Sequence, residues 1–306
     1  MSFKKLALLL LSGAGLYSVA SSSAAAGNAR ERKRIFREKG FWVIAHRGFS
    51  GRYPENTMLA FEQAAALPID AIELDVHSTR DAKIVVIHDP TLDRTTDRNG
   101  RVLDFTWDAI KKVDAGFLFD PEKTGDYPYR GKGIVIPLLE DVFRRFPEMK
   151  FIIEIKQVMP AIEESVYRLI RKYRMEDKVI VASEHNEPLL RFRNIDSVVA
   201  TSVSAEEAQE LHQSFRMRLA NFYRTRGDAV QIPEAYQGTR VVTPAFIRAV
   251  KRKGLALHIW TVNEVEDMQR LMLWGVDGII TDFPDRLLHL VKTEKEFIAE
   301  TQSTQS

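Results

Sequence analysis

Along residues 41–292 the apolar positions follow two alternating patterns, one typical of β-strands and one typical of α-helices. Short runs rich in β-branched residues, which favour strands, are separated by longer segments whose apolar residues recur at helical spacing. The strand-like runs are WVIAH, AIELDV with KIVVIH, KFIIEIK, KVIVASE, SVVATSV, AVQIP, ALHIWTV and GIITDF. The helical segments are MLAFEQAAAL, LLEDVFRRF, IEESVYRLIRKY, EPLLRFRNI, AEEAQELHQSFRMRL, TPAFIRAVKRKG and EVEDMQRLMLWG. Residues predicted to cap the first, fifth and last of these helices are Thr57 or Asn56, Ser204 and Asn263.

The number of these units indicates the fold. Only STRDA separates the second and third strand runs, which is too short for a parallel crossover, so the two are predicted to form a β-hairpin. Counting the hairpin as one strand position gives eight strand–helix units, and we predict an α/β fold of the TIM-type (β/α)₈ barrel class. A doubly wound open sheet is the alternative, but its usual Gly-rich phosphate loop is absent from the sequence.

The register of the hairpin depends on where its turn is centred. A turn near Arg80–Asp81 would pair His88 with Glu73, and a turn one residue later would pair it with Asp75. Both registers bring His88 level with the two carboxylates.

Several segments depart from the repeat. Residues 90–137 are polar and turn-rich and are predicted to be an insertion at the C-terminal mouth of the barrel. Residues 1–26 have the basic start, apolar run and small residues of a secretory signal peptide, which predicts export to the periplasm or the extracellular space. The basic linker 27–40 opposes translocation, so an N-terminal membrane anchor is the alternative. Residues 293–306 are predicted to form a polar tail after the barrel, 41–292.

Composition excludes some classes of function. The chain has 306 residues, a formal net charge of +2 and no cysteine. The small net charge gives no case for nucleic-acid binding. The lack of cysteine excludes disulfides, Cys-based zinc sites and a thiol nucleophile. The sequence specifies neither an oligomeric state nor a protein partner.

Charged residues gather where strand runs end, which in a barrel is the mouth that carries the chemistry. Residues two apart on a strand face the same way, so Glu73 and Asp75 lie on one side together. Adjacent carboxylates repel unless a positive group lies between them, which makes a divalent cation the natural occupant. Glu154 and Lys156 repeat this spacing on the next strand. Three carboxylates suit Mg²⁺ or Ca²⁺ better than zinc.

Two histidines and further polar groups join them. His46 and Arg47 end the first strand, His88 ends the hairpin and Trp260 ends a later strand. Arg47 and Lys156 suit a phosphate, and two histidines suit a reaction that moves one proton off a nucleophile and one onto a leaving oxygen. Together these groups indicate phosphodiester cleavage. Each of these residues alone could simply belong to a surface ion pair or a turn. That interpretation would require three strand ends to carry such charged groups independently, so we favour a shared site. The histidines interpreted as structural are His77, His185, His212, His258 and His289.

One set of motifs resembles a known family. HRG, PENT, ELDVHSTRD with VVIHD, LDRTT, IPLLEDVF, IEIK, IWTVN and TDFP occur in order from about Trp42 to Leu290, and the set resembles the glycerophosphodiester phosphodiesterase family. The resemblance implies a TIM-type barrel and metal-dependent hydrolysis of a glycerophosphodiester to an alcohol and a glycerol phosphate. The implied ligands of the cation are Glu73, Asp75 and Glu154. The implied acid–base pair is His46 and His88, with His88 also at the metal, and the implied substrate contacts are Arg47 and Lys156 to the phosphate and Trp260 in the pocket.

Two other functions are weighed against this one. The first is a lysophospholipase D that acts on membrane lysophospholipids with the same site. It is supported by the apolar N-terminus and by insertion aromatics that suggest membrane-surface contact: Phe117, Phe119, Tyr127 and Tyr129. The second is a catalytically silent barrel that binds phosphodiesters, which loss of a histidine or carboxylate would suggest. None is lost from the set.

Overall fold

The computed structural model describes residues 33–37 and 40–303, with side chains up to residue 294. The chain divides into two compact units after Arg32, and every described residue belongs to the second, Lys33–Ser306. The predicted signal peptide or anchor, residues 1–26, therefore lies outside the described residues. Among the helices of the described part, none is both long enough and apolar enough to cross a membrane.

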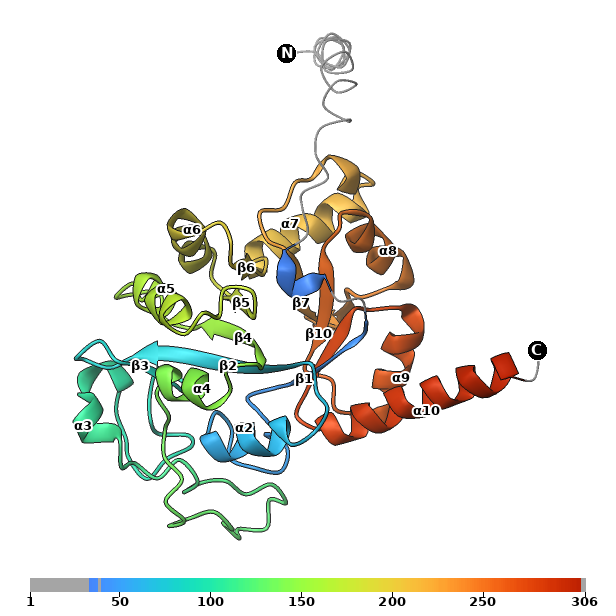
Figure 1. Ribbon diagram of the computed structural model, residues 1–306. Helices are drawn as coiled ribbons and strands as arrows, with labels where there is room; N and C mark the ends of the chain where they lie inside the picture. The colour runs from blue at the N-terminus through green and yellow to red at the C-terminus, as the bar shows by residue number, and fades with distance from the viewer. Residues whose placement is uncertain (1–32, 38–39, 304–306) are drawn as a thin grey trace, which may run out of the picture. The chain divides into compact units, whose positions relative to one another are not determined.

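Eight parallel strands form a barrel in the described part of the chain, which confirms the predicted fold class (Figure 1). Strands that follow one another along the chain also lie side by side, in the order β6-β5-β4-β2-β1-β11-β10-β7. A parallel bridge between Ser202 and Ala229 joins the two ends of this order. The strands are β1 (Trp42–Ala45), β2 (Ala71–Ser78), β4 (Lys150–Ile155), β5 (Val179–Ala182), β6 (Ala200–Thr201), β7 (Ala229–Pro233), β10 (Ala256–Trp260) and β11 (Gly278–Thr281).

Helices connect the successive strands around the outside of the barrel (Figure 1). Thr57 caps the first of them, and Ser204 forms a capping box with Glu207, as predicted. The prediction for Asn263 is wrong: the N-cap position of α9 is Glu264, because the side chain of Asn263 binds Asp282 instead. The helices are α2 (Met58–Ala65), α4 (Leu139–Arg145), α5 (Glu163–Lys172), α6 (Asn186–Ile195), α7 (Ala205–Arg216), α8 (Pro244–Arg252), α9 (Val265–Trp274) and α10 (Pro284–Ser303), the last of which continues into the predicted polar tail.

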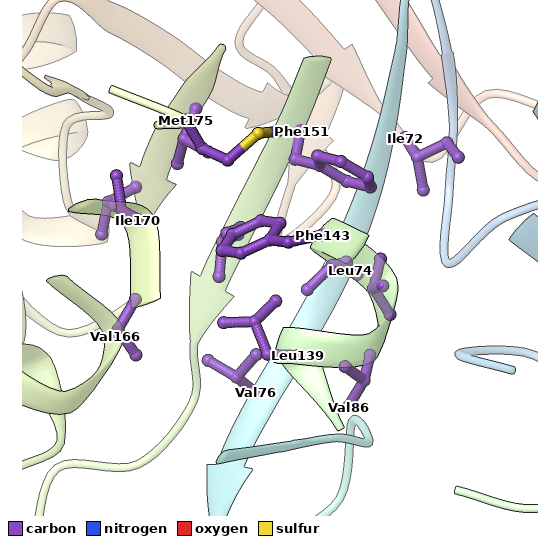
Figure 2. Close-up of a cluster of buried hydrophobic side chains, with 14 of the residues drawn as sticks. Ile72, Leu74, Val76, Val86, Leu139, Phe143, Phe151, Val166, Ile170 and Met175 are labelled. Atoms are coloured by element: carbon purple, nitrogen blue, oxygen red, sulfur yellow. The ribbon is translucent and has the colours of Figure 1, made fainter. Parts of the chain in front are cut away.

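Strand alternation divides the apolar residues between two cores. Leu74 of β2 faces outward and packs with Phe151 of β4 against α4 and α5 (Figure 2). Ala71 of β2 and Ile152 of β4 belong to a second cluster, which fills the inside of the barrel. Each buried large side chain contributes about 1.5–3 kcal/mol, so the outer core supplies much of the stability that holds the strands in register.

The N-terminal end of the barrel is closed by the first described residues. Ile35 and Phe36 of η1 (Arg34–Phe36) are buried, although they lie in the range predicted as a linker. Phe36 stacks on Trp42 with ring centroids 5.9 Å apart, and Trp42 stacks on His258 at 5.4 Å. Burial lowers the pKa of His258 to about 3, so its ring is neutral and packs as part of this floor.

The predicted hairpin is present, but its register differs from both predicted ones. β3 (Ile84–Val86) pairs antiparallel with β2 so that Val76 lies opposite Val86, and Ile87 donates a backbone hydrogen bond to Asp75. The cause is a three-residue loop, 80–82, in place of a two-residue turn, with Ala82 at a φ of 58°. His88 therefore lies beyond the ladder.

The insertion, residues 90–137, packs as a small unit of its own at the mouth. It contains η2 (Val102–Asp104) and α3 (Trp107–Ile110) and little other regular structure. Its buried residues, such as Leu92 and Val102, join Val85 and Ile87 of the hairpin in one hydrophobic cluster. This cluster fixes the segment that carries His88.

Candidate active site

Three carboxylates meet at the C-terminal ends of β2 and β4. Asp75 lies opposite Glu154 in the parallel register of the two strands, and Glu73 precedes Asp75 by two residues on the same face. One oxygen from each lies within 4.8 Å of the others. Glu73 and Asp75 are buried, and Glu154 is partly exposed. The structure thus brings together the three residues that the sequence singles out.

The electrostatics of this cluster favour an added cation. Burial and the neighbouring Asp75 raise the pKa of Glu73 to about 8. Two basic groups offset part of the negative charge: Arg47 Nε lies 3.2 Å from Asp75 Oδ2, and Lys156 Nζ lies 3.1 Å from Glu154 Oε1. Buried oxygen donors at this spacing fit Mg²⁺ or Ca²⁺.

The backbone after β1 turns sharply and aims Arg47 at the cluster. Arg47 has a φ of 52°, and its N–H donates to Glu73 Oε2 over 3.0 Å. Gly48 follows with a φ of 82°, and a Cβ at this position would lie 2.8 Å from the carbonyl carbon of Ala60. Arg47 Nε is buried and has no hydrogen-bond partner within the described residues. The charge of that nitrogen is instead balanced by Asp75, whose Oδ2 lies 3.2 Å away.

His46 lies between two carboxylates. Its Nδ1 is 2.6 Å from Asp282 Oδ1, and its Nε2 is 3.9 Å from Glu73 Oε2. Burial disfavours the imidazolium, but Asp282 and Glu73 outweigh it and raise the pKa of His46. Asp282 is itself held by the Ser50 hydroxyl at 2.8 Å and the Asn263 amide at 2.7 Å. His46 is thereby fixed in orientation, with Nε2 toward the carboxylates.

His88 has an equivalent partner. Its Nδ1 lies 2.5 Å from Asp89 Oδ1, and Arg94 Nε donates to Asp89 over 2.6 Å. Arg94 also donates to both oxygens of Glu55, at 2.7 and 2.8 Å, and Glu55 accepts from Arg47 over 2.9 Å. One arginine of the insertion therefore links the supports of His88 and Arg47. The carboxylate cluster does not include His88, whose second role as a metal ligand stays a prediction.

The remaining predicted residues lie around this centre. Asn56 donates to Asp75 Oδ2 over 2.9 Å and fixes the orientation of that carboxylate. Trp260, the last residue of β10, has 44% of its side chain exposed. A cavity of about 260 Å³ lies beside Lys156, between the insertion and the loop after β4. Its lining includes His77, Arg101, Leu103, Gln157 and Met159, and none of its lining residues is acidic.

Sequence reasoning missed several supporting residues. Asp282 ends the last strand run, in TDFP, and the strand-end argument used for His46 would have found it. Asp89 directly follows His88 in the sequence, and this adjacency is the signal that could have identified it as the partner of His88. Arg94 lies in the irregular insertion, where no periodicity indicates which way a side chain points.

Comparisons with known proteins identify the family of this chain. The pattern of the glycerophosphoryl diester phosphodiesterase family matches residues 46–286. A glycerophosphodiester phosphodiesterase from Caldanaerobacter subterraneus subsp. tengcongensis is 37% identical over 82% of this chain and 97% of its own length. One from Bacillus subtilis is 36% identical over 89% of this chain and 91% of its own length.

A solved structure of a protein with the same family name is also similar to this chain. The crystal structure of a glycerophosphodiester phosphodiesterase from Agrobacterium tumefaciens matches 81% of this chain and 99% of its own, at 25% identity and a TM-score of 0.65. The family pattern spans most of the barrel, from His46 at the end of the first strand to Arg286 in the last helix. The protein belongs to the glycerophosphoryl diester phosphodiesterase family.

Proposed function

We propose that the protein hydrolyses glycerophosphodiesters to an alcohol and glycerol 3-phosphate. The observation that carries the proposal is the carboxylate cluster, with oxygens within 4.8 Å, together with His46 Nε2 at 3.9 Å from Glu73. Metal-assisted phosphodiester cleavage needs a metal site, an acid–base group and basic side chains that bind the phosphate. Here the basic side chains are those of Arg47 and Lys156. Family membership supports the same chemistry.

The cluster would hold the divalent cation through Glu73, Asp75 and Glu154. When bound, such a cation polarises a phosphoryl oxygen and lowers the pKa of an attacking hydroxyl. The guanidinium of Arg47, whose side chain is 17% exposed, binds another phosphate oxygen in this proposal. Lys156 Nζ, 3.9 Å from Asp75 Oδ1, binds a third. These contacts would hold the phosphate near His46, whose Nε2 lies 3.9 Å from Glu73 Oε2.

The two histidines move the protons. In each ring an aspartate holds Nδ1, so Nδ1 carries the hydrogen and Nε2 is left for the substrate. One Nε2 accepts the proton of the attacking hydroxyl, and the other donates a proton to the leaving alcohol oxygen. The attacking hydroxyl is either water or the neighbouring hydroxyl of the glycerol, and the second route passes through a cyclic phosphate.

The cavity beside Lys156 is a suitable site for the alcohol half of the diester. It adjoins the phosphate contacts through Lys156, and its lining mixes polar groups with apolar ones such as Leu103. One observation favours a lysophospholipid as an alternative substrate: Met159 and Trp260 expose apolar surface at the mouth, 68% and 44% of each residue. A lysophospholipase D would use the same catalytic groups.

Product release tests the proposal and separates the two substrates. The full chain is incubated with glycerophosphocholine or with lysophosphatidylcholine, with Mg²⁺ or Ca²⁺ and with or without EDTA. We expect glycerol 3-phosphate from the soluble diester and no release in EDTA. Faster turnover of the lysolipid would favour the alternative. No cleavage of either, with the fold intact by circular dichroism, would leave a binding barrel.

Export rests on the N-terminal pattern alone. The basic start, apolar run and small residues of residues 1–26 support a cleaved signal peptide, and the basic linker supports an anchor. Sequencing the N-terminus of the protein from the periplasmic or secreted fraction tests this proposal. A new N-terminus near residue 27 is the expected result, and an intact one in the membrane fraction would contradict it.

A further inference from the structure

The loop that follows α7 exposes three large apolar side chains. Met217, Leu219 and Phe222 are 63%, 48% and 78% exposed. The loop is ordered by η3 (Ala220–Phe222), in which Ala220 is buried and anchors the segment. A phenylalanine held at the surface to this degree marks a contact surface rather than a core position. Because the loop connects the end of α7 to the start of β7, it lies at the N-terminal end of the barrel.

The same loop is strongly basic. Residues 216–226 contain four arginines and no acidic residue. Arg216, Arg218 and Arg224 are exposed, and no ion-pair partner is found for them within the described residues. The exposed part of the insertion, residues 118–132, instead mixes Asp and Glu with Lys and Arg. Apolar side chains flanked by unpaired positive charge suit an anionic lipid surface.

The chain enters the barrel at this same end. Lys33 donates to the backbone carbonyl of Ser197, and Arg34 forms an ion pair with Asp177 at 3.1 Å. Ser197 and Asp177 both precede strands, so residue 33 lies at the N-terminal face. Lys33 and Arg34, the first described residues, therefore lie at the face that carries the exposed loop.

The aromatics of the insertion are less available. Tyr129 packs against Phe119, with ring centroids 5.6 Å apart, and against Tyr53 at 6.0 Å. The Arg130 guanidinium lies 4.1 Å from the Phe117 ring and 3.8 Å from the Tyr127 ring. These rings stabilise the insertion internally.

We propose that the N-terminal face of the barrel docks on an anionic lipid bilayer. In this arrangement Met217, Leu219 and Phe222 enter the headgroup region, and the exposed arginines contact lipid phosphates. The carboxylate mouth, at the opposite end of the strands, then faces the aqueous phase. If the proposed function holds, this orientation favours soluble glycerophosphodiesters over lysolipids embedded in the same bilayer.

The absence of cysteine permits a direct test of orientation with the full chain. An environment-sensitive fluorophore is attached to a Phe222→Cys variant and, as a matched control at the mouth, to a Leu118→Cys variant. Vesicles of phosphatidylcholine, with or without phosphatidylglycerol, are then added. We expect a blue shift at position 222 with the anionic vesicles only, and none at position 118. A shift at 118 alone, or at neither position, would overturn the proposal. A shift at 222 without vesicles that grows with protein concentration would instead identify a second copy of the chain as the occupant.

A charge series supplies the second measurement. We expect the triple variant Arg216→Gln, Arg218→Gln and Arg224→Gln to weaken partitioning into anionic vesicles by roughly a hundredfold, since each basic group near such a surface contributes about a factor of five. The control carries the same change of charge on the insertion, at Lys112, Lys123 and Lys132, and should change partitioning far less. Equal effects of the two sets would contradict a specific face. Because vesicle binding is read without turnover, its failure is distinct from failure of the proposed function.

Discussion

At the N-terminal end of the barrel the interior is apolar and stacked, whereas at the C-terminal end it is charged. Phe36, Trp42 and a neutral His258 form a continuous stack at the floor. At the mouth, which is the opposite end of the same strands, Glu73 and Asp75 lie side by side. The floor packs aromatic rings, with the Lys150 ammonium 5.1 Å from the Trp42 ring. The mouth holds carboxylates together, and burial with the neighbouring Asp75 raises the pKa of Glu73 to about 8.

The difference teaches how one set of strands serves two purposes. The inward positions of β1 read Trp42, Ile44 and then His46, so the same face passes from packing to chemistry in five residues. Residues that close the floor lower the free energy of the fold. Residues at the mouth raise it, because they are arranged for a ligand. Substitutions at the two ends should therefore separate stability from turnover.

The largest expected effect is at the cation cluster. Glu73→Gln should reduce turnover to background, a loss of at least ~10³-fold, because cation stabilisation of transition-state charge is worth several kcal/mol. Turnover of the soluble diester with saturating Mg²⁺ or Ca²⁺ measures it. Glu207→Gln is the control, since Glu207 is also buried but forms an ion pair with Arg193 at 2.8 Å and is not a member of the cluster. If Glu73→Gln kept wild-type turnover, the cluster would not be the cation site.

The histidines come next. His46→Ala and His88→Ala should each lower kcat by ~10²–10⁴-fold, because general acid–base catalysis contributes about that much. His258→Ala is the matched control at the floor and should affect stability instead. Steady-state kinetics of the three variants, measured under one condition, give the kcat values that test this prediction. A histidine at the mouth whose loss left kcat unchanged would be removed from the acid–base pair.

Two tryptophans at opposite ends give the third comparison. Trp42 is 5% exposed in the floor and Trp260 is 44% exposed at the mouth. Trp42→Ala should lower the free energy of unfolding by ~3–5 kcal/mol, the usual cost of a large-to-small change in a core, and leave kcat of the folded protein unchanged. Trp260→Ala should cost under about 1 kcal/mol and raise KM. Urea unfolding with kinetics on the same samples measures both, and the reverse pattern would refute the division between floor and mouth.

The smallest effect is a gain in stability at the mouth. The pKa of Glu73 is raised to about 8 in the folded protein from the model-peptide 4.5, so in the absence of a cation the fold loses stability as pH rises from 4.5 toward 8. Glu73→Gln has no such loss, and at pH 7 we expect metal-free unfolding to cost ~1–3 kcal/mol more than in wild type. The two proteins should be equally stable below pH 4. If Glu73→Gln were less stable than wild type at pH 7, the repulsion between Glu73 and its neighbouring carboxylates would not destabilise the metal-free fold.

Much of this molecule is predictable from local patterns. The period of the apolar residues gives the barrel strands and the helices α2 and α4–α9. The alternation that puts Leu74 outward also puts Glu73 and Asp75 inward. Parallel neighbours then bring Glu154 beside Asp75 without further information. Thr57 and Ser204 are likewise local signals, because a cap bonds within its own turn.

What escaped prediction depends on geometry outside one element. The register of the hairpin differs from the predicted ones because its loop holds three residues, with Ala82 in the left-handed region, and not two. Asn263 does not cap its helix because Asp282, nineteen residues away in the chain, accepts its hydrogen bond. Arg94 reaches both Glu55 and Asp89 only after the insertion has folded on the hairpin. Each case requires a contact between segments that sequence spacing does not relate.

The most direct test of the account is calorimetric titration of Mg²⁺ and of Ca²⁺ into the metal-free full chain at pH 6 and at pH 9. The account predicts one saturable site with higher affinity at pH 9, with protons released at pH 6, because Glu73 must lose its proton to become a ligand. Glu73→Gln should show no such site. No saturable binding of either cation, or binding unchanged by pH and by Glu73→Gln, would contradict the claim that the carboxylate cluster at the mouth is the cation site on which function depends.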